Sequence, residues 1–332
     1  MKTVHSTLWY GACIRWGLRL TSSRIGKRIK IMNDEPTLVG ADGESALRSA
    51  PMTERGLERE AEDSRYVPVI LKRTDEALRH PDDTLEVAIA EGLEQLDRST
   101  TSLILSSIAA GMIVGFSAMA VGVVTALTLP LESPLATRIG TALVYPLGFV
   151  ICVISGAQLF TEHTATAVYP LLDRRARIGQ VLRLWLLVVL GNLIGAAAIA
   201  FLLTAADEVI GARAGYIELG HHLTHFPPAA LLTSSVLAGW LMALGAWLLM
   251  STPPGSEVKL IYMVTFLIGT GGLHHSIAGS VEMFAAMFAS GEFTITHALQ
   301  FISTALVGNV IGGSLFVAVL NYGHIRRTQI AE

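Results

Sequence analysis

The residues best suited to chemistry are two adjacent histidines, His274 and His275, inside a glycine-rich stretch of an apolar segment. Glu282 follows about two helical turns further on, on the same face of a predicted helix. Ionisable groups at membrane depth are costly, so they usually face a cavity, a transport pathway or a partner. A buried histidine can pass its proton to a weak-acid anion or donate a hydrogen bond to it. We therefore predict that a polar solute passes His275, that His274 faces elsewhere, and that Glu282 pairs with a polar group at a helix end.

A second polar interruption, in an earlier apolar segment, contains the run from Leu159 to Glu162. Thr161 is suited to cap the helix that follows, and Glu162 would then lie in its first turn, where the helix dipole favours a carboxylate. Helix N-termini at the middle of a membrane favour anions. We predict that Leu159 and Phe160 form an apolar plug beside this site.

The composition indicates a membrane protein with a polar N-terminal part. Of the 332 residues, 52% are hydrophobic and 15% are charged, against about 25% charged in an average soluble domain. Residues 1–100 contain 15 of the 24 lysines and arginines and 17 of the 27 acidic residues. The net charge is −3, and no extended basic patch follows the first thirty residues, so nucleic acid is not expected as a partner.

Six apolar segments have the length needed to cross a bilayer. The second and the fifth are longer than about 20 residues and are interrupted by polar or glycine-rich sequence, which predicts helices broken at the midplane. An amphipathic helix over residues 83–100, opened by a capping box at Asp83 and Glu86, is expected to pack on the cytoplasmic face. The predicted segments are 102–128, 139–171, 181–206, 229–250, 257–289 and 295–321.

An internal repeat relates the two halves of the apolar region. The motif Gly191–Ala196 recurs as Gly308–Gly313 at an offset of 117 residues, and the same offset pairs Phe160 in one interruption with Ile277 in the other. Three spans in each copy is an odd number, so the copies must cross the membrane in opposite directions. The predicted fold is therefore an all-α polytopic membrane protein of two inverted three-helix repeats.

The repeated motif contains residues with two kinds of predicted role. Its glycines allow helices to approach closely. Asn192 and Asn309 carry amides that need hydrogen-bond partners when buried, so they are predicted to bind exposed backbone at the breaks or to orient a histidine.

Basic residues in the connections give the orientation. With the N-terminus inside, the inner connections hold seven lysines and arginines, and the outer ones hold only Arg138 and Arg213. Both termini are therefore predicted to be cytoplasmic. The predicted organisation is a largely disordered cytoplasmic region over 1–82, the amphipathic helix over 83–100, a six-span domain over 101–322 and a cytoplasmic tail over 323–332.

Three histidines of one outer connection, His221, His222 and His225, could suggest a metal site. No cysteine or acidic residue accompanies them at metal-ligand spacing, so we predict no metal there and expect a solvated loop or a surface that attracts anions or protons. The sequence contains no HExxH, P-loop, GxSxG or dinucleotide motif, so neither an enzyme nor a cofactor is expected.

Three motifs together resemble the formate/nitrite transporter family, and within it the YfdC branch. They are the run Gly156–Thr164, the element His275–Gly279 and the closing Gly308–Gly313, and the resemblance covers about residues 85–325. It implies an aquaporin-like protomer in the bacterial inner membrane, assembled as a homopentamer with one pore in each protomer. It also implies passage of a small monovalent anion or its conjugate acid.

The resemblance further implies two constrictions with a central histidine between them. This histidine is His275, with Thr161 on the loop of the broken second span and Asn309 as its hydrogen-bond partner. The constriction residues are, on the inner side, Leu159, Phe160, Phe149 and Met242 and, on the outer side, Ile268 and Tyr145. Candidate modulators of the pathway are Glu162, His163, His274, Asn192 and Glu282.

The chain departs from the family pattern at several positions. The family glutamate before Leu159 is Gln158 here, and the pair Glu162–His163 replaces small or neutral polar residues. Gly239 replaces an asparagine of the fourth span, and the histidine-rich stretch 219–226 replaces an outer lysine. Loss of a fixed positive charge weakens the attraction of anions at neutral pH, and protonated histidines could restore it in acid.

Three functions fit the sequence. The first is a permease for a small monovalent anion or its conjugate acid that uses His275 as a proton relay. The second is a neutral-solute pore of aquaglyceroporin type. The third is a membrane scaffold or sensor that acts through residues 1–100 and transports little.

Overall fold

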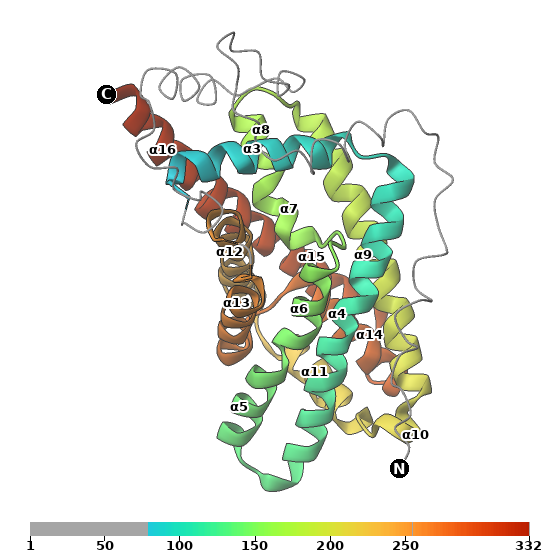
Figure 1. Ribbon diagram of the computed structural model, residues 1–332. Helices are drawn as coiled ribbons and strands as arrows, with labels where there is room; N and C mark the ends of the chain where they lie inside the picture. Colours follow the sequence, from blue (N-terminus) through green and yellow to red (C-terminus); the bar gives the residue numbers. More distant parts are fainter. Residues whose placement is uncertain (1–78, 254, 332) are drawn as a thin grey trace, which may run out of the picture. The chain divides into compact units, whose positions relative to one another are not determined.

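The computed structural model describes residues 79–253 and 255–331, and every regular element in this part is a helix (Figure 1). The predictions for the N-terminal region up to residue 78 lie outside the described residues. In chain order the helices are α3 (Pro81–Asp97), α4 (Thr100–Thr128), the 3-10 turn η1 (Leu129–Leu131), α5 (Pro134–Val144), α6 (Pro146–Ile154), α7 (Phe160–Thr166), α8 (Val168–Leu172), α9 (Ile178–Ala205), α10 (Asp207–Ile210), α11 (Arg213–His225), α12 (Pro228–Ser251), α13 (Glu257–Gly271), α14 (Ser276–Ala289), α15 (Ile295–Ile311), the π-helical stretch η2 (Gly312–Val319) and α16 (Leu320–Ala331).

The described helices form six membrane spans. Five are long and apolar enough to cross a membrane, and the bent pair α13 and α14 makes the sixth. The spans are α4, then α5 and α6 with α7 after a break, then α9, α12, the bent pair, and the run from α15 to α16. The second span begins at Pro134 rather than at the predicted residue 139. Ser133 caps this helix, and Pro134 lies in its first turn, where proline is favoured.

The two predicted breaks are present and share one backbone geometry. Leu159 precedes α7 with φ −96° and ψ 128°, and His275 precedes α14 with φ −96° and ψ 129°. In the fifth span, α13 and α14 are bent by 54° at the break. Leu159 therefore corresponds to His275, and Phe160 to Ser276. The prediction that Phe160 corresponds to Ile277 is therefore wrong by one residue. It used the offset between the Gly-Asn motifs (308 − 191 = 117), whereas the offset between the two breaks is one residue smaller (275 − 159 = 116).

Glycines allow corresponding helices of the two repeats to pack at close range. A methyl group at Gly195 on α9 would overlap the carbonyl of Ile108 on α4, and one at Gly312 would overlap the carbonyl of Val236 on α12. Gly239 on α12 packs equally closely against the backbone of α15. The predicted packing role of the glycines is confirmed.

Helix α3 lies across one end of the spans, on the same side as α8 and α16, and α5 and α11 lie at the opposite end (Figure 1). Its apolar face is buried, with Leu85 and Ile89 fully covered. The ring of His80 accepts a hydrogen bond from the backbone N–H of Asp82 and caps the helix, so α3 begins at Pro81 and the predicted capping box at Asp83 is wrong.

The sixth span is not a plain α-helix, which the sequence analysis did not foresee. The stretch Gly312–Val319 is π-helical, and its Ser314 Oγ donates a hydrogen bond of 2.7 Å to the carbonyl of Thr164 on α7. Gly313 packs against the side chain of the same threonine. Irregular turns of this kind are frequent near functional sites, and this one contacts the broken second span.

Replacing Gly195 by alanine should destabilise the protein, because the added methyl group would overlap the backbone of α4. Overpacking of this kind costs about 1–3 kcal/mol. Gly179, near the start of the same helix, has open space around it, so Gly179→Ala is the matched control and should keep or slightly raise stability. The thermal unfolding midpoint of the purified protein in detergent measures both variants. Equal midpoints would contradict the packing role.

Candidate functional site: the meeting point of the two broken spans

The two broken spans meet at a hydrogen bond between Thr161 and His275. Thr161 Oγ1 lies 2.9 Å from His275 Nε2, and the two residues are 0% and 1% exposed. His275 also caps α14, since its Nδ1 accepts from the backbone N–H groups of Ile277 and Ala278, each at 3.2 Å. Because Nδ1 is an acceptor, the proton of the neutral imidazole lies on Nε2 and is donated to Thr161.

The cap of α7 differs from the prediction. Leu159, not Thr161, occupies the N-cap position, and Thr161 lies in the first turn together with Glu162. The N–H of Phe160 at the start of this helix is bound by the side chain of Asn192. The hydroxyl of Thr161 is therefore not used in capping and is available to His275 and to a solute.

Asn192 closes the first break by binding backbone on both sides of it. Its Oδ1 accepts from the N–H of Phe160 at 2.9 Å. Its Nδ2 donates to the carbonyl of Gln158 at 2.9 Å and to the carbonyl of Ser107 on α4 at 2.8 Å. One fully buried side chain thus satisfies two backbone groups that the break would otherwise leave unpaired.

Asn309 makes the same set of hydrogen bonds at the second break. Its Oδ1 accepts from the N–H of Ser276 at 2.8 Å, and its Nδ2 donates to the carbonyls of Ser235 at 2.7 Å and His274 at 3.2 Å. The expected hydrogen bond to the ring of His275 is absent, because the amide is occupied by the backbone on either side of that residue. Asn309 therefore positions His275 through the main chain.

Apolar side chains enclose the contact between Thr161 and His275. The ring of Phe149 meets that of His275 edge-on with centroids 5.1 Å apart, and Tyr145 lies 5.1 Å from Phe149. The residues expected at the constrictions are all buried in one hydrophobic cluster, namely Leu159, Phe160, Phe149, Met242, Ile268 and Tyr145. The site is thus a single hydrogen bond in apolar surroundings.

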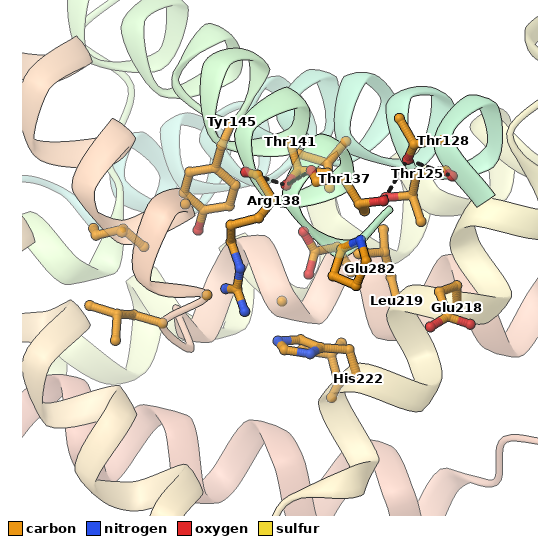
Figure 2. Close-up of a pocket in the computed structure, with 18 of the residues that line it drawn as sticks. Thr125, Thr128, Thr137, Arg138, Thr141, Tyr145, Glu218, Leu219, His222 and Glu282 are labelled. Atoms are coloured by element: carbon orange, nitrogen blue, oxygen red, sulfur yellow. Dashed lines mark hydrogen bonds between the residues drawn. The ribbon is translucent and has the colours of Figure 1, made fainter. Parts of the chain in front are cut away.

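A cavity of about 480 Å³, here called the outer vestibule, lies on the side of α5 and α11 (Figure 2). Its lining includes His275 and the two residues expected at the outer constriction, Tyr145 and Ile268. Glu282 also lines it and is 8% exposed. The expected pairing of Glu282 with a helix end is wrong, since its side chain borders the cavity and finds no hydrogen-bond or ion-pair partner within 79–253 and 255–331.

Arg138 supplies a fixed positive charge to the site. In the sequence it was considered only as one of the basic residues that indicate the orientation in the membrane. Its guanidinium extends from α5 into the outer vestibule, on the same side as His222 (Figure 2). The guanidinium lies so close to Gly272 at the second break that any side chain there would overlap it. The vestibule therefore contains a fixed cation contributed by α5. The sequence contains one feature that could have pointed to Arg138, namely that it is one of only two basic residues in the connections predicted to be outside.

The histidine-rich stretch expected as a solvated loop forms the helix α11 instead. His221 and His225 are exposed on it, whereas His222 lines the outer vestibule and stacks on His274 with ring centroids 5.5 Å apart. The ring of His274 thus packs on α11, and its Nδ1 lies 2.8 Å from Ser234 Oγ on α12. Burial lowers the pKa of His222, and the charge of Arg138 lowers it further, so this imidazole is neutral at neutral pH.

On the other side of the apolar cluster, Glu162 and Met242 line a cavity of about 20 Å³, enough for about one water molecule. Glu162 Oε1 is buried without a hydrogen-bond partner among the described residues. The same holds for both ring nitrogens of the neighbouring His163. In the described ranges no group of three or more histidine, cysteine or acidic residues is arranged to hold a metal.

The model of the family described as "Formate/nitrite transporter" matches residues 82–323, well over half of the chain. The chain belongs to the formate/nitrite transporter family. The inner membrane protein YfdC of Escherichia coli (strain K12) is 29% identical over 242 residues, which cover 71% of this chain and 76% of YfdC.

Solved structures of the family have the same fold. An "FNT family ion channel" matches with a TM-score of 0.67 at 20% identity and covers 74% of this chain and 99% of its own. A "pentameric formate channel with formate bound" matches with a TM-score of 0.56 at 21% identity, covering 68% and 97%. These findings confirm the predicted six-span, aquaporin-like fold. The protein is a multi-pass membrane protein of a transporter and channel family, and not an enzyme.

Replacing Asn309 by alanine should destabilise the second break, since it leaves the buried backbone groups of Ser276 and His274 unpaired. Each such group costs about 1–3 kcal/mol. Asn192→Ala should have an effect of similar size at the first break. Thr233→Ala, an exposed position on α12 bonded only within its own helix, serves as the control. Thermal midpoints in detergent that match the control would contradict this role of the asparagines.

Proposed function

We propose that the protein conducts a small monovalent weak-acid anion, or its conjugate acid, across the bacterial inner membrane. The observation that carries the proposal is the buried hydrogen bond between Thr161 and His275 where the two broken spans meet, next to a vestibule that contains Arg138. A fixed cation attracts anions, whereas apolar side chains around the narrow part favour a neutral species. A weak acid meets both demands, because it can arrive as an anion and cross as its conjugate acid.

For His275, the geometry supports the role of hydrogen-bond donor over that of proton relay. Its Nδ1 faces the N–H groups of Ile277 and Ala278, so a second proton on the ring would point at two donors and break the cap of α14. The Nε2 proton is held by Thr161 Oγ1. No other acceptor for the hydroxyl proton of Thr161 lies in the described part of the chain, so this proton can be donated to an oxygen of the solute.

Family relatives and exposed side chains support the proposed assembly and topology. A family relative is described as a pentameric channel, and large apolar side chains such as Leu127, Leu186 and Phe201 are exposed here, as contact with lipid or neighbouring protomers requires. We infer a homopentamer with one pathway in each protomer. The excess of basic residues in the connections near α3 and α16 favours cytoplasmic termini.

Uptake into proteoliposomes tests the proposal with formate, nitrite, lactate and the neutral solute glycerol. The wild type should take up at least one weak-acid anion, faster when the outside is acidic, and should exclude glycerol. Thr161→Val keeps the shape of the side chain and the cap of α14 but removes the hydroxyl. It should lower anion uptake by about fivefold, the value of one hydrogen bond, without changing the pH dependence.

His275→Phe should abolish uptake, but it also removes a helix cap, so Thr161→Val is the more informative variant. Glycerol uptake that is indifferent to pH would favour the neutral-solute pore. The absence of any uptake would favour the scaffold hypothesis. Full anion uptake by Thr161→Val would contradict the role given to this hydrogen bond.

Replacing Arg138 by glutamine should reduce uptake at low anion concentration by about tenfold, the low end of electrostatic effects on association. The reason is that the vestibule loses the cation that attracts the anion. The loss should shrink at high salt, which screens the charge. Arg213→Gln is the matched control, since Arg213 is the other basic residue of the outer connections and lies outside the vestibule lining. Equal effects of the two substitutions would contradict a local role for Arg138.

A further inference from the structure

The proposed passage of a weak acid needs a group that gives a proton to the incoming anion, and the geometry of His275 does not provide one. Neutral His275 could release only its Nε2 proton, which would leave an imidazolate, and its Nδ1 is occupied by the cap of α14. Two carboxyl groups that are not exposed border the pathway, Glu282 on one side of the apolar cluster and Glu162 on the other. Neither has a use in the fold described so far.

Glu282 is placed to meet a solute in the outer vestibule. It lies on α14 and lines the same cavity as His275, and it is 8% exposed. Within the described residues no hydrogen bond or ion pair holds its carboxyl group. In Figure 2 its carboxyl group lies in the lining between Tyr145 and His222. Seven other ionisable groups line the cavity with it, from the segment before α5, from α5, from the junction of α5 and α6, from α11 and from the break, and they are Glu132, Arg138, Tyr145, Glu218, His222, His274 and His275.

Glu162 borders the pathway on the other side of the apolar cluster. It follows Thr161 directly in the first turn of α7 and lines the cavity that has space for about one water molecule. Its Oε1 is buried and has no hydrogen-bond partner among the described residues. The titratable groups near it are Glu91 on α3, Cys152 on α6 and its neighbour His163, and Arg98, directly after α3, is near His163 in turn.

We propose that Glu282 and Glu162 exchange protons with the permeating weak acid, one on each side of the constriction. A buried carboxyl group without a partner is held in its protonated form, so it carries a proton when an anion arrives. The anion loses its water as it enters the apolar constriction, which raises its own affinity for a proton and allows it to take the proton of the carboxyl group. This inference rests on the proposed function and adds the two residues that would make passage of the neutral acid possible.

The exchange balances in protons and charge. During uptake, the O–H bond of the Glu282 carboxyl breaks and a new O–H bond forms on the anion, which leaves a carboxylate and a neutral acid. Glu162 first releases its proton to water on the inner side. The neutral acid then crosses beside Leu159 and Phe160 and gives its proton to the Glu162 carboxylate, which regenerates the anion and the protonated Glu162. Glu282 regains a proton from water in the vestibule. One proton therefore moves with each anion, in the same direction.

The test measures uptake of labelled formate and the internal pH of proteoliposomes at a neutral and an acid outside pH. Glu282→Gln keeps the size and polarity of the side chain but cannot exchange a proton. It should lower uptake on the order of a hundredfold, the usual contribution of a positioned proton donor. The coupled acidification of the lumen should fall with it, and Glu282→Asp should restore both in part. Glu162→Gln should behave like Glu282→Gln.

Glu292→Gln is the matched control, because Glu292 is an exposed carboxylate just after α14 that pairs with His221 at 3.2 Å, outside the vestibule. It should transport like the wild type. Nitrate, the anion of a strong acid, should pass poorly through the wild type, since it cannot be protonated at these pH values.

Unchanged formate uptake and acidification in Glu282→Gln would overturn the inference while leaving the proposed function standing. A loss shared by Glu282→Gln and Glu282→Asp, together with a lowered thermal midpoint, would show a structural role and would also overturn it. If the wild type moves no weak-acid anion, the proposed function fails and this inference fails with it.

Discussion

Backbone groups at membrane depth must find hydrogen-bond partners, and the helical domain depends on how this demand is met at its two breaks. Each break exposes main-chain N–H and carbonyl groups where no water competes for them. Asn192 and Asn309 bind these groups with the same set of contacts. The glycines matter for the same reason, because the asparagine-bearing helices can reach the breaks only if they pack closely on α4 and α12. His275 extends this arrangement by capping α14 with one ring nitrogen.

The sequence predicts the features that follow from one-dimensional patterns. Hydropathy and segment length gave the six spans, and the spacing of the repeated Gly-Asn motif gave the inverted repeat and the two breaks. What could not be predicted is which atoms meet. Whether Asn309 binds the ring of His275 or the backbone beside it depends on the rotation of α15 by a fraction of a turn. The prediction for Glu282 was wrong for a similar reason. Whether its side chain reaches a helix end or borders a cavity depends on the position of another helix, α11.

The two halves of the domain share one backbone arrangement but place different chemistry on it. Leu159 and His275 occupy equivalent positions with nearly identical dihedral angles, yet the first adds to the apolar cluster and the second provides a hydrogen-bond donor. The fold can tolerate this difference because Asn192 secures the start of α7 without help from the residue before it. The residue before the helix can therefore differ between the two repeats. The asparagine is needed in both, because each break has backbone groups that it must bind.

The π-helical stretch in the sixth span has a consequence for the C-terminal helix. The third span, α9, is an unbroken α-helix, so the correspondence between the repeats ends near Gly313, and the following residues have no counterpart in the first repeat. Two of them, Tyr322 and Arg326, bind Asp173 directly after α8, at 3.2 and 2.9 Å, while Ser314 holds α7. The C-terminal helix and the broken second span are therefore joined by direct hydrogen bonds. A displacement of α16 would act on α7, which carries Thr161, through these bonds and through α12, which contacts both α7 and η2.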